Sequence, residues 1–309
     1  MTRFDVLVVG GAGVDTLVRV DELTLPAGDS VEVPPIRDYV AHTGNGVALG
    51  LHTLGVRTTF LDYVGDDEQG RLIRDRYHAA GLDFTGLPAP AGTPRSVNLV
   101  DRKGRRFSFY DGRHPADLRM PADVAEPLVR DVRHVHLTRA DHVRDLFPVA
   151  RAAGRTVSTD LHTWDGEHPS AADYAYGSDL VFLSGELIHG REAEVTARII
   201  DRGRARVVVV MDGARGCHVR LRGDDAPRHY PATPPSRPVV DSNGVGDAFV
   251  SAFLTAWLRD EPLAEAVFAG LVSGAFACGA HGTHEELIDA PGLAREKRLA
   301  ATAVAGDPQ

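Results

Sequence analysis

Residues 241–257 read DSNGVGDAFVSAFLTAW, and this stretch decides the fold class. The segment PVVDS, which overlaps its start, is predicted to be a short apolar strand that ends in a carboxylate. NGVG is a glycine-rich turn. After it, aromatic residues recur at helical spacing at Phe249, Phe253 and Trp257. A strand, a glycine turn and a helix in this order predict that Asp247 stands at the start of the helix.

A glycine turn that leads into a helix can bind phosphate. The first backbone N–H groups of a helix have no partner inside it, and the helix dipole is positive at that end. A carboxylate in the same turn can accept the proton of an alcohol that attacks the phosphate. Phosphoryl transfer requires mainly positioning and charge stabilisation, which this segment could supply. The structural alternative is that Asp247 caps the helix and the glycines only turn the chain.

DSNGVGDAF resembles the DTxGAGD signature of the PfkB/ribokinase family of sugar and nucleoside kinases. The resemblance implies that Asp247 is the catalytic base, and that the backbone N–H groups of Gly244, Val245 and Gly246 form an anion hole. It also implies ATP and Mg²⁺ as cofactors, and Asp241 matches the position that ligates a potassium-type cation in some family members.

Other segments extend the resemblance over most of the chain. FDVLVVGGAGVDT resembles the family's first strand, whose Asp holds substrate hydroxyls, while VVVVMDGARG and HGTHEELI resemble the segments beside the nucleotide. The residues that it places at the substrate are Asp15, His42, Gly44 and Asn45. Those that it places at the nucleotide are Ser184, Asp212, Gly213, Gly216 and Gly282.

Two departures from the family pattern affect the predicted site. The family's sugar-holding Asn falls at Gly46, and His42 replaces a glycine. We therefore expect simple ribose or fructose to be handled poorly, and a larger substrate to fill the vacated space with His42 and Asn45 as contacts. In SGEL, Ser184 stands where the family has Asn, and only a shift of one residue would let Glu186 serve as the Mg²⁺ ligand.

Composition limits the function classes. The chain has 309 residues, of which 43% are hydrophobic and 25% charged, an ordinary globular balance. A net charge of -9 argues against nonspecific nucleic-acid binding. Two cysteines make no disulfide framework, and no run of apolar residues is long enough for a signal peptide or a membrane span. We expect a cytoplasmic enzyme without a membrane partner.

The order of predicted elements is mostly strand–helix alternation, which favours a mainly parallel sheet covered on both faces. Buried strands are predicted at 5–9, 132–138, 179–183 and 206–211. Helices are predicted at 45–54, 67–80, 189–201, 247–258 and 262–279. With the resemblance, this predicts one ribokinase-like domain over 1–309, a three-layer α/β/α sandwich.

Residues 15–42 and 93–114 break the alternation, and the second range reads as a hairpin. Together they could form a small β-sheet lid over the active site; the alternative is a pair of surface loops. The resemblance implies a homodimer that forms through this lid.

Two other functions compete with the kinase. The glycines of VLVVGGAGVD, with Asp29 and Glu32 roughly 20 residues on, partly match a Rossmann dinucleotide fingerprint. However, Thr16 stands where its third glycine would be, and the following residues alternate like a strand. A non-catalytic sugar sensor is favoured by the two departures and opposed by the intact turn. The reading preferred here is an ATP-dependent kinase acting on a hydroxyl, primary by expectation, of a sugar, sugar acid or nucleoside.

Overall fold

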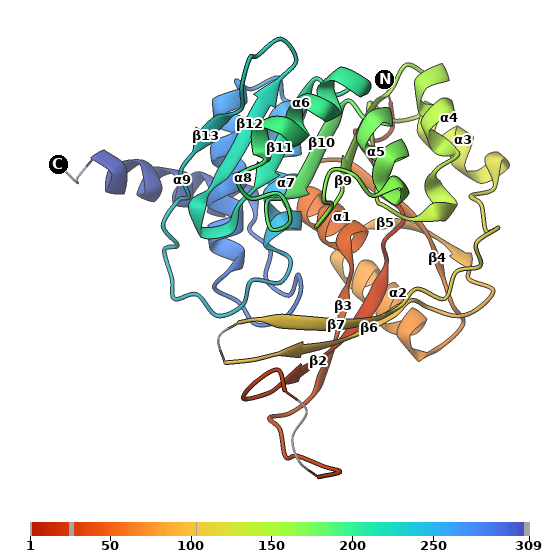
Figure 1. Cartoon of the computed structure of the whole chain (residues 1–309). Helices are drawn as coiled ribbons and strands as arrows, with labels where there is room; N and C mark the ends of the chain where they lie inside the picture. Colours follow the sequence, from red (N-terminus) through yellow and green to blue (C-terminus); the bar gives the residue numbers. More distant parts are fainter. Residues whose placement is uncertain (1, 25–27, 103, 306–309) are drawn as a thin grey trace.

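The computed structural model describes residues 2–24, 28–102 and 104–305, and its larger sheet has nine strands in the order β13-β12-β11-β10-β9-β8-β1-β4-β5 (Figure 1). Its strands are β1 (Val6–Val9), β4 (Thr58–Val64), β5 (Asp83–Pro88), β8 (His134–Leu137), β9 (Thr156–Asp160), β10 (Leu180–Ser184), β11 (Val207–Met211), β12 (Cys217–Leu221) and β13 (Arg228–Tyr230). All neighbours from β5 to β11 pair in parallel, and β12 and β13 add an antiparallel edge.

Helices cover both faces of this sheet. They are α1 (Thr43–Thr53), α2 (Glu68–Ala80), α3 (Ala122–Arg130), α4 (Leu146–Ala152), α5 (Ala172–Gly177), α6 (Glu192–Arg202), α7 (Val245–Leu258), α8 (Leu263–Ala277) and α9 (Ala290–Ala305). Alternate residues of β1 face opposite ways: Val6 and Val8 pack with α1, α7 and α8, whereas Leu7 and Val9 pack with α3 and α4. Burial on both faces explains why this strand is uniformly apolar. The predicted three-layer α/β/α fold is confirmed.

A second sheet of four strands, called the lid below, lies apart from the large one at the foot of Figure 1. Its order is β3-β2-β6-β7, and its strands are β2 (Gly13–Arg19), β3 (Arg37–Ala41), β6 (Arg95–Val100) and β7 (Arg106–Asp111). These strands fall almost wholly in the two ranges predicted to break the alternation. Within those ranges, 25–27 and 103 lie outside the described residues.

The register of the lid places its polar residues in rows. Asp15 on β2 is paired with Ser96 on β6, which is paired with Tyr110 on β7. Arg19 and Arg106 both pair with Val100 and form a second row. Paired residues point to the same face, and so do residues an even number apart on one strand. Asp15 and Arg19 therefore share a face, about 13 Å apart at the usual rise per residue.

The segment around the glycine turn differs from the prediction in two ways. PVVDS is not a strand: Val239 is 64% exposed, and the N–H groups of Val240 and Asp241 both donate to the carbonyl of Cys278. The end of α8, not a sheet edge, holds this segment. Helix α7 begins at Val245 with Gly244 as its N-cap and no side-chain cap, so the reading of Asp247 as a helix cap is wrong.

The order of elements after β1 and the lengths of the helices bear on two further expectations. The strand β1 is followed by the strand β2 and not by a helix, so the Rossmann reading is wrong. In the described part of the chain, no helix has both the length and the apolarity that a membrane crossing needs.

Candidate active site

The glycine turn leaves backbone donors free at the start of α7. The first N–H that bonds back into the helix is that of Ala248, to the carbonyl of Gly244 at 2.9 Å. The N–H groups of Val245, Gly246 and Asp247 precede it, and such groups need partners from outside the helix. Two of these groups, those of Val245 and Gly246, belong to the predicted anion hole, which stays a prediction.

The two glycines of the turn are there for different reasons. Gly244 has a φ of 74°, and a Cβ on it would lie 2.6 Å from the His284 ring. Gly246 has no positive φ, and its nearest contacts would be ordinary ones, with Met211 Cε at 3.5 Å and Asp160 Oδ2 at 3.9 Å. Neither strain nor crowding explains a glycine at 246, and the absence of a side chain leaves the backbone there open to close approach.

Asp247 belongs to a buried hydrogen-bonded chain that reaches it through a histidine. Its Oδ2 lies 2.7 Å from His284 Nε2, and His284 Nδ1 lies 2.9 Å from Asn45 Nδ2. The Asn45 amide also donates to the carbonyl of Val40 at 3.2 Å. Because this amide is the donor, we assign Nδ1 of His284 as the acceptor, so that Nε2–H donates to Asp247. Sequence reasoning missed this role of His284: the residue lies in HGTHEELI, but nothing in that segment indicates a contact with Asp247.

The position of the family's Asn is closed in this chain. A Cβ on Gly46 would overlap His284 Nε2 and lie 2.6 Å from Asp247 Cβ, so α1 packs closely on α7 here. Asn45 is fully buried and bonds to His284. The expectation of open space at position 46 is therefore wrong, because His284 and Asp247 fill it. Asn45 contacts His284, and its contact with the substrate stays a prediction.

Asp15 lies at the centre of a polar group on the inner face of the lid. His42 Nε2 is 3.4 Å from Asp15 Oδ1 and 3.3 Å from Ser96 Oγ, and its ring is 5.6 Å from that of Tyr110. Thr283 Oγ1 donates to Asp15 at 3.4 Å. Burial raises the pKa of Asp15, but the hydrogen bonds from His42 and Ser96 outweigh it and hold the pKa below its usual value. An ionised carboxylate results, suited to accept hydrogen bonds from hydroxyls.

His42 and Gly44 differ in how they meet their positions. His42 has a φ of 74°, which a glycine adopts without strain. The histidine is held there by Asp15 and Ser96. A Cβ on Gly44 would overlap the carbonyl of Gly10, so Gly44 is required by packing between α1 and the segment after β1.

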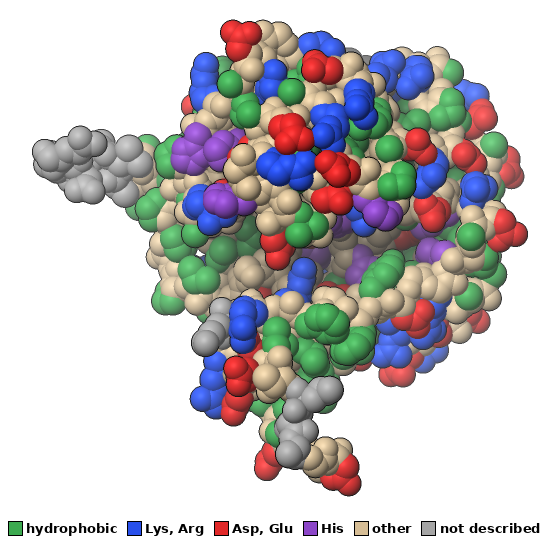
Figure 2. All heavy atoms as spheres, viewed as in Figure 1, with side chains coloured by type: hydrophobic (Ala, Val, Ile, Leu, Met, Phe, Trp, Pro, Cys, Tyr) green, Lys and Arg blue, Asp and Glu red, His purple; other side chains and the backbone are tan. Residues whose placement is uncertain are grey.

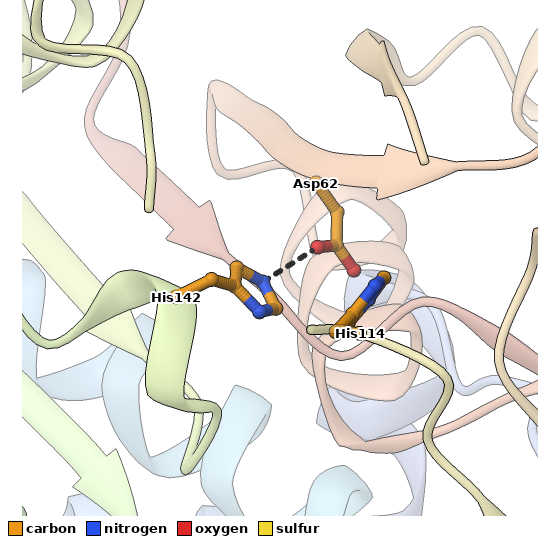
Figure 3. A group of neighbouring side chains, drawn as sticks. All are labelled: Asp62, His114 and His142. Atoms are coloured by element: carbon orange, nitrogen blue, oxygen red, sulfur yellow. Dashed lines mark hydrogen bonds and ion pairs between the residues drawn. The ribbon is translucent and has the colours of Figure 1, made fainter. Parts of the chain in front are cut away.

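A second cluster, missed from the sequence, brings together Asp62 of β4 with His114 and His142, which follow β7 and β8 (Figure 3). Asp62 accepts hydrogen bonds from His142 Nε2 at 3.1 Å and from the N–H groups of Tyr63 and Ala12 at 2.8 and 2.6 Å. Burial and His142 lower the pKa of His114, which keeps that ring neutral. The Asp62 carboxylate is already satisfied by three donors, so the cluster needs no metal to explain it. Figure 2 shows a hollow between the lid and the body of the molecule, with histidine side chains along it.

The residues predicted at the nucleotide form two groups. The N–H of Gly185, next to Ser184, bonds to the carbonyl of Met211, and this joins the loop after β10 to the turn over 212–216. Within that turn Asp212 is paired with Arg215 at 2.6 Å, and Gly213 and Gly216 both have positive φ. Gly282 forms the second group: the nearest atoms to a Cβ on it belong to Tyr39 of the lid.

The two predicted metal positions have different surroundings. Glu186 is exposed, and no polar contact of its carboxylate is found among the described residues. Asp241 is buried, and its Oδ2 lies 3.0 Å from Arg19 Nη2. Two groups in the described chain could gather around a metal ion, Asp62 with His114 and His142, and His189 with Glu192 and Asp212, and neither includes these positions.

The fold and the site together define a kinase that transfers phosphate from ATP to the hydroxyl of a carbohydrate. The chain belongs to the pfkB family of carbohydrate kinases, whose family model matches residues 4–290. It is therefore an ATP-dependent phosphotransferase with an alcohol group as acceptor, and not a dinucleotide enzyme or a non-catalytic sensor.

The chain is similar to characterised carbohydrate kinases over most of its length. The chain is 47% identical over 292 residues to an acarbose 7(IV)-phosphotransferase of Actinoplanes sp., covering 94% of this chain and 97% of that one. It is 30% identical to an ATP-dependent ribose-1-phosphate kinase of Halopiger xanaduensis, over 90% and 93% of the two chains.

Among solved structures, the microbiome-derived acarbose kinase Mak1 superposes with a TM-score of 0.89 at 47% identity, over 96% of this chain and 100% of that one. A ribokinase of Arabidopsis thaliana with ribose and ATP gives 0.81 at 20% identity, over 96% and 99% of the two chains, and supports the fold alone.

Proposed function

We propose that this kinase phosphorylates acarbose or a closely similar sugar, in preference to ribose or fructose. The observation that carries the proposal is the closed position at Gly46, where the side chain of the family's sugar-holding Asn has no room beside His284 and Asp247. A substrate must then be held by other groups, and Asp15, His42 and Ser96 offer them. The 47% identity to two proteins named for acarbose supports this choice of sugar.

The proposed mechanism assigns a step to each part of the site. Asp15, oriented by His42 and Ser96, accepts hydrogen bonds from substrate hydroxyls and fixes the attacking one. Asp247, held by His284, would take the proton of that hydroxyl as its oxygen bonds to the γ-phosphorus of ATP, while the bond from that phosphorus to the β–γ bridging oxygen breaks and ADP leaves. The N–H groups of residues 244–246 donate hydrogen bonds to the oxygens of the phosphoryl group as it is transferred.

We propose that Mg²⁺ binds with the phosphates of ATP and that Glu186 is its protein ligand. Mg²⁺ takes oxygen ligands, keeps several waters and uses one or two carboxylates together with substrate phosphates. Glu186 fits this description, because its carboxylate is exposed and has no polar partner among the described residues. A bound Mg²⁺ would neutralise charge on the phosphate oxygens.

The acceptor is tested by ADP release from Mg²⁺-ATP with acarbose, ribose, fructose and adenosine. We expect kcat/KM for acarbose to exceed that for ribose or fructose by about 10²-fold or more, because a ligand that leaves buried polar groups unpaired is strongly rejected. His42→Gly should lower kcat/KM for acarbose, whereas His78→Gly on the exposed side of α2 should not. If ribose or fructose is among the best acceptors, or if His42→Gly changes nothing, the proposal is wrong.

We also propose a cytoplasmic homodimer that forms through the outer face of the lid. Val97 and Phe109 are paired in register, and Phe107 packs edge-on against Phe109 with ring centres 5.0 Å apart. These side chains are 38%, 58% and 54% exposed, and an apolar patch of this kind marks an interaction surface. Hydrophobic side chains are visible over the lid in Figure 2. Phe107→Glu should give a monomer by sedimentation; a monomeric wild type would contradict the proposal.

The cytoplasmic placement rests on ATP as the donor and on Cys217 and Cys278, which are free thiols.

A further inference from the structure

Two arginines of the lid reach the polar residues of the glycine turn. Arg19, the last residue of β2, contacts Asp241 Oδ2 through Nη2 at 3.0 Å. Arg106, the first residue of β7, donates from Nη1 to Asn243 Oδ1. Both are in register with Val100, so they leave the lid from one row and one face, the face that also carries Asp15.

The Arg19 contact removes a charge that would oppose the reaction. The Asp241 side chain is only 3% exposed, and a buried carboxylate without a partner is strongly unfavourable. Asp241 also stands just before the N–H groups proposed to hold the phosphoryl oxygens, where an unpaired negative charge would repel them. The guanidinium of Arg19 neutralises it. It is held in turn by His281, whose Nδ1 lies 3.0 Å from the same Nη2.

Arg106 adds a charge that nothing nearby cancels. Its partner, Asn243, is neutral, and no carboxylate of the described residues lies within ion-pair distance of it. Asn243 is itself buried at the turn, so a net positive charge is left beside the proposed anion hole.

The potassium-type cation implied by the family resemblance does not fit this site. Of the two oxygens of Asp241, Oδ2 contacts Arg19, and Oδ1 accepts the N–H of Asn243 at 3.0 Å. A free cation would have to displace a guanidinium that three groups already orient: the Asp241 carboxylate, the His281 ring and the β2 backbone that carries it.

We propose that Arg19 takes the place of the monovalent cation, so that this kinase needs no K⁺. Arg19 is a positioning residue: it acts through Asp241 on the turn and does not touch the reacting atoms. Because it belongs to the lid, the charge that completes the turn arrives with the lid, and closure over the substrate and completion of the anion hole are one event. The inference rests on the proposed role of the turn.

The first test compares the wild-type enzyme in tetramethylammonium and in K⁺ salts at constant ionic strength, with the best acceptor from the substrate screen. We expect kcat to change by less than about twofold, because screening is the same in both salts and no site awaits the ion. Saturable activation by K⁺ overturns the inference. Absence of turnover with every acceptor would instead contradict the proposed substrate.

The second test removes the internal cation. Arg19→Met should lower kcat/KM in tetramethylammonium by about 10²-fold, the order seen when one charge-stabilising group of such a site is removed. K⁺ should restore part of the loss saturably, which a merely structural role for Arg19 would not produce. Arg102→Met removes a lid arginine that pairs with exposed Asp21, and should change activity less than about twofold.

The double variant Arg19→Met with Asp241→Asn separates charge from folding. If Arg19 acts by neutralising Asp241, deleting both charges should recover more activity than Arg19→Met alone retains, and this variant should no longer respond to K⁺. The inference is overturned if Arg19→Met is fully active without K⁺. It is also overturned if the double variant loses more kcat/KM than the two single variants lose together. Circular dichroism checks each variant, and should Arg19→Met fail to fold, the wild-type comparison still decides.

Discussion

Replacing Asp247 with Asn lowers kcat by about 10²–10⁴, the usual range for loss of a general base, and leaves KM nearly unchanged. The substitution keeps the size of the side chain and can still pair with His284 Nε2, but it no longer accepts a proton. Helix α7 does not depend on it, because Gly244 is the N-cap and no side chain caps the helix. Steady-state ADP release measures the effect, and thermal unfolding shows that the fold is intact.

Two further variants complete this prediction. His284→Ala keeps the carboxylate and removes the group that orients it, and should lower kcat about tenfold with KM little affected, since misplacement of a catalytic group is costly. Asp201→Asn, on an exposed position of α6, is the matched control and should be silent. Asp247→Asn with more than about half of wild-type activity would exclude Asp247 as the base.

Gly246→Val should abolish most of the activity of a protein that folds normally. The position has no positive φ, and a Cβ meets only Met211 and Asp160 at ordinary distances, so strain is not expected. Valine is also a better helix former than glycine. The side chain would, however, stand where phosphoryl oxygens approach the N–H groups, and losing one such donor costs about 2.7–4 kcal/mol in the transition state, or 10²–10³-fold in kcat.

Gly244→Val is the comparison that separates stability from catalysis. Its φ of 74° is strained for valine, and its Cβ would lie 2.6 Å from the His284 ring. We expect this variant to lose both unfolding temperature and activity, whereas Gly246→Val loses activity alone. Normal turnover by Gly246→Val would mean that the turn is only structural.

The pKa of Asp160, a carboxylate close to the glycine turn, is also shifted. Burial raises the pKa of Asp160, at the end of β9, and the charge of Asp247 acts in the same direction. No motif in the sequence distinguishes Asp160 from the other carboxylates. It shares this environment because the end of β9 lies beside the start of α7, where a Cβ on Gly246 would be 3.9 Å from Asp160 Oδ2.

Local patterns in the sequence were enough to predict the layers of the fold. The apolar run Val6–Val9 is a strand buried on both faces, and the helical spacing after the glycine turn is helix α7. The motif at 241–247 identified the family, because a glycine turn before a helix is a contiguous feature whose chemistry does not depend on the rest of the chain. The prediction of a strand at PVVDS is wrong because the backbone of this segment is hydrogen-bonded to Cys278, which is distant in the sequence. Composition alone does not indicate such a long-range partner.

The fold class, the family and the glycine turn could therefore be predicted from the sequence, because each depends on short contiguous segments. Tertiary structure alone decided what surrounds the turn. His284 meets Asn45 across 239 residues, and Arg19 meets Asp241 across 222. His284 and Asp241 lie in loops, Arg19 ends β2, and Asn45 is in the first turn of α1. No hydrophobic period marks these polar side chains, and their partners are set by how the lid and α1 approach α7. A contact between distant polar residues depends on that packing, and no local pattern encodes it.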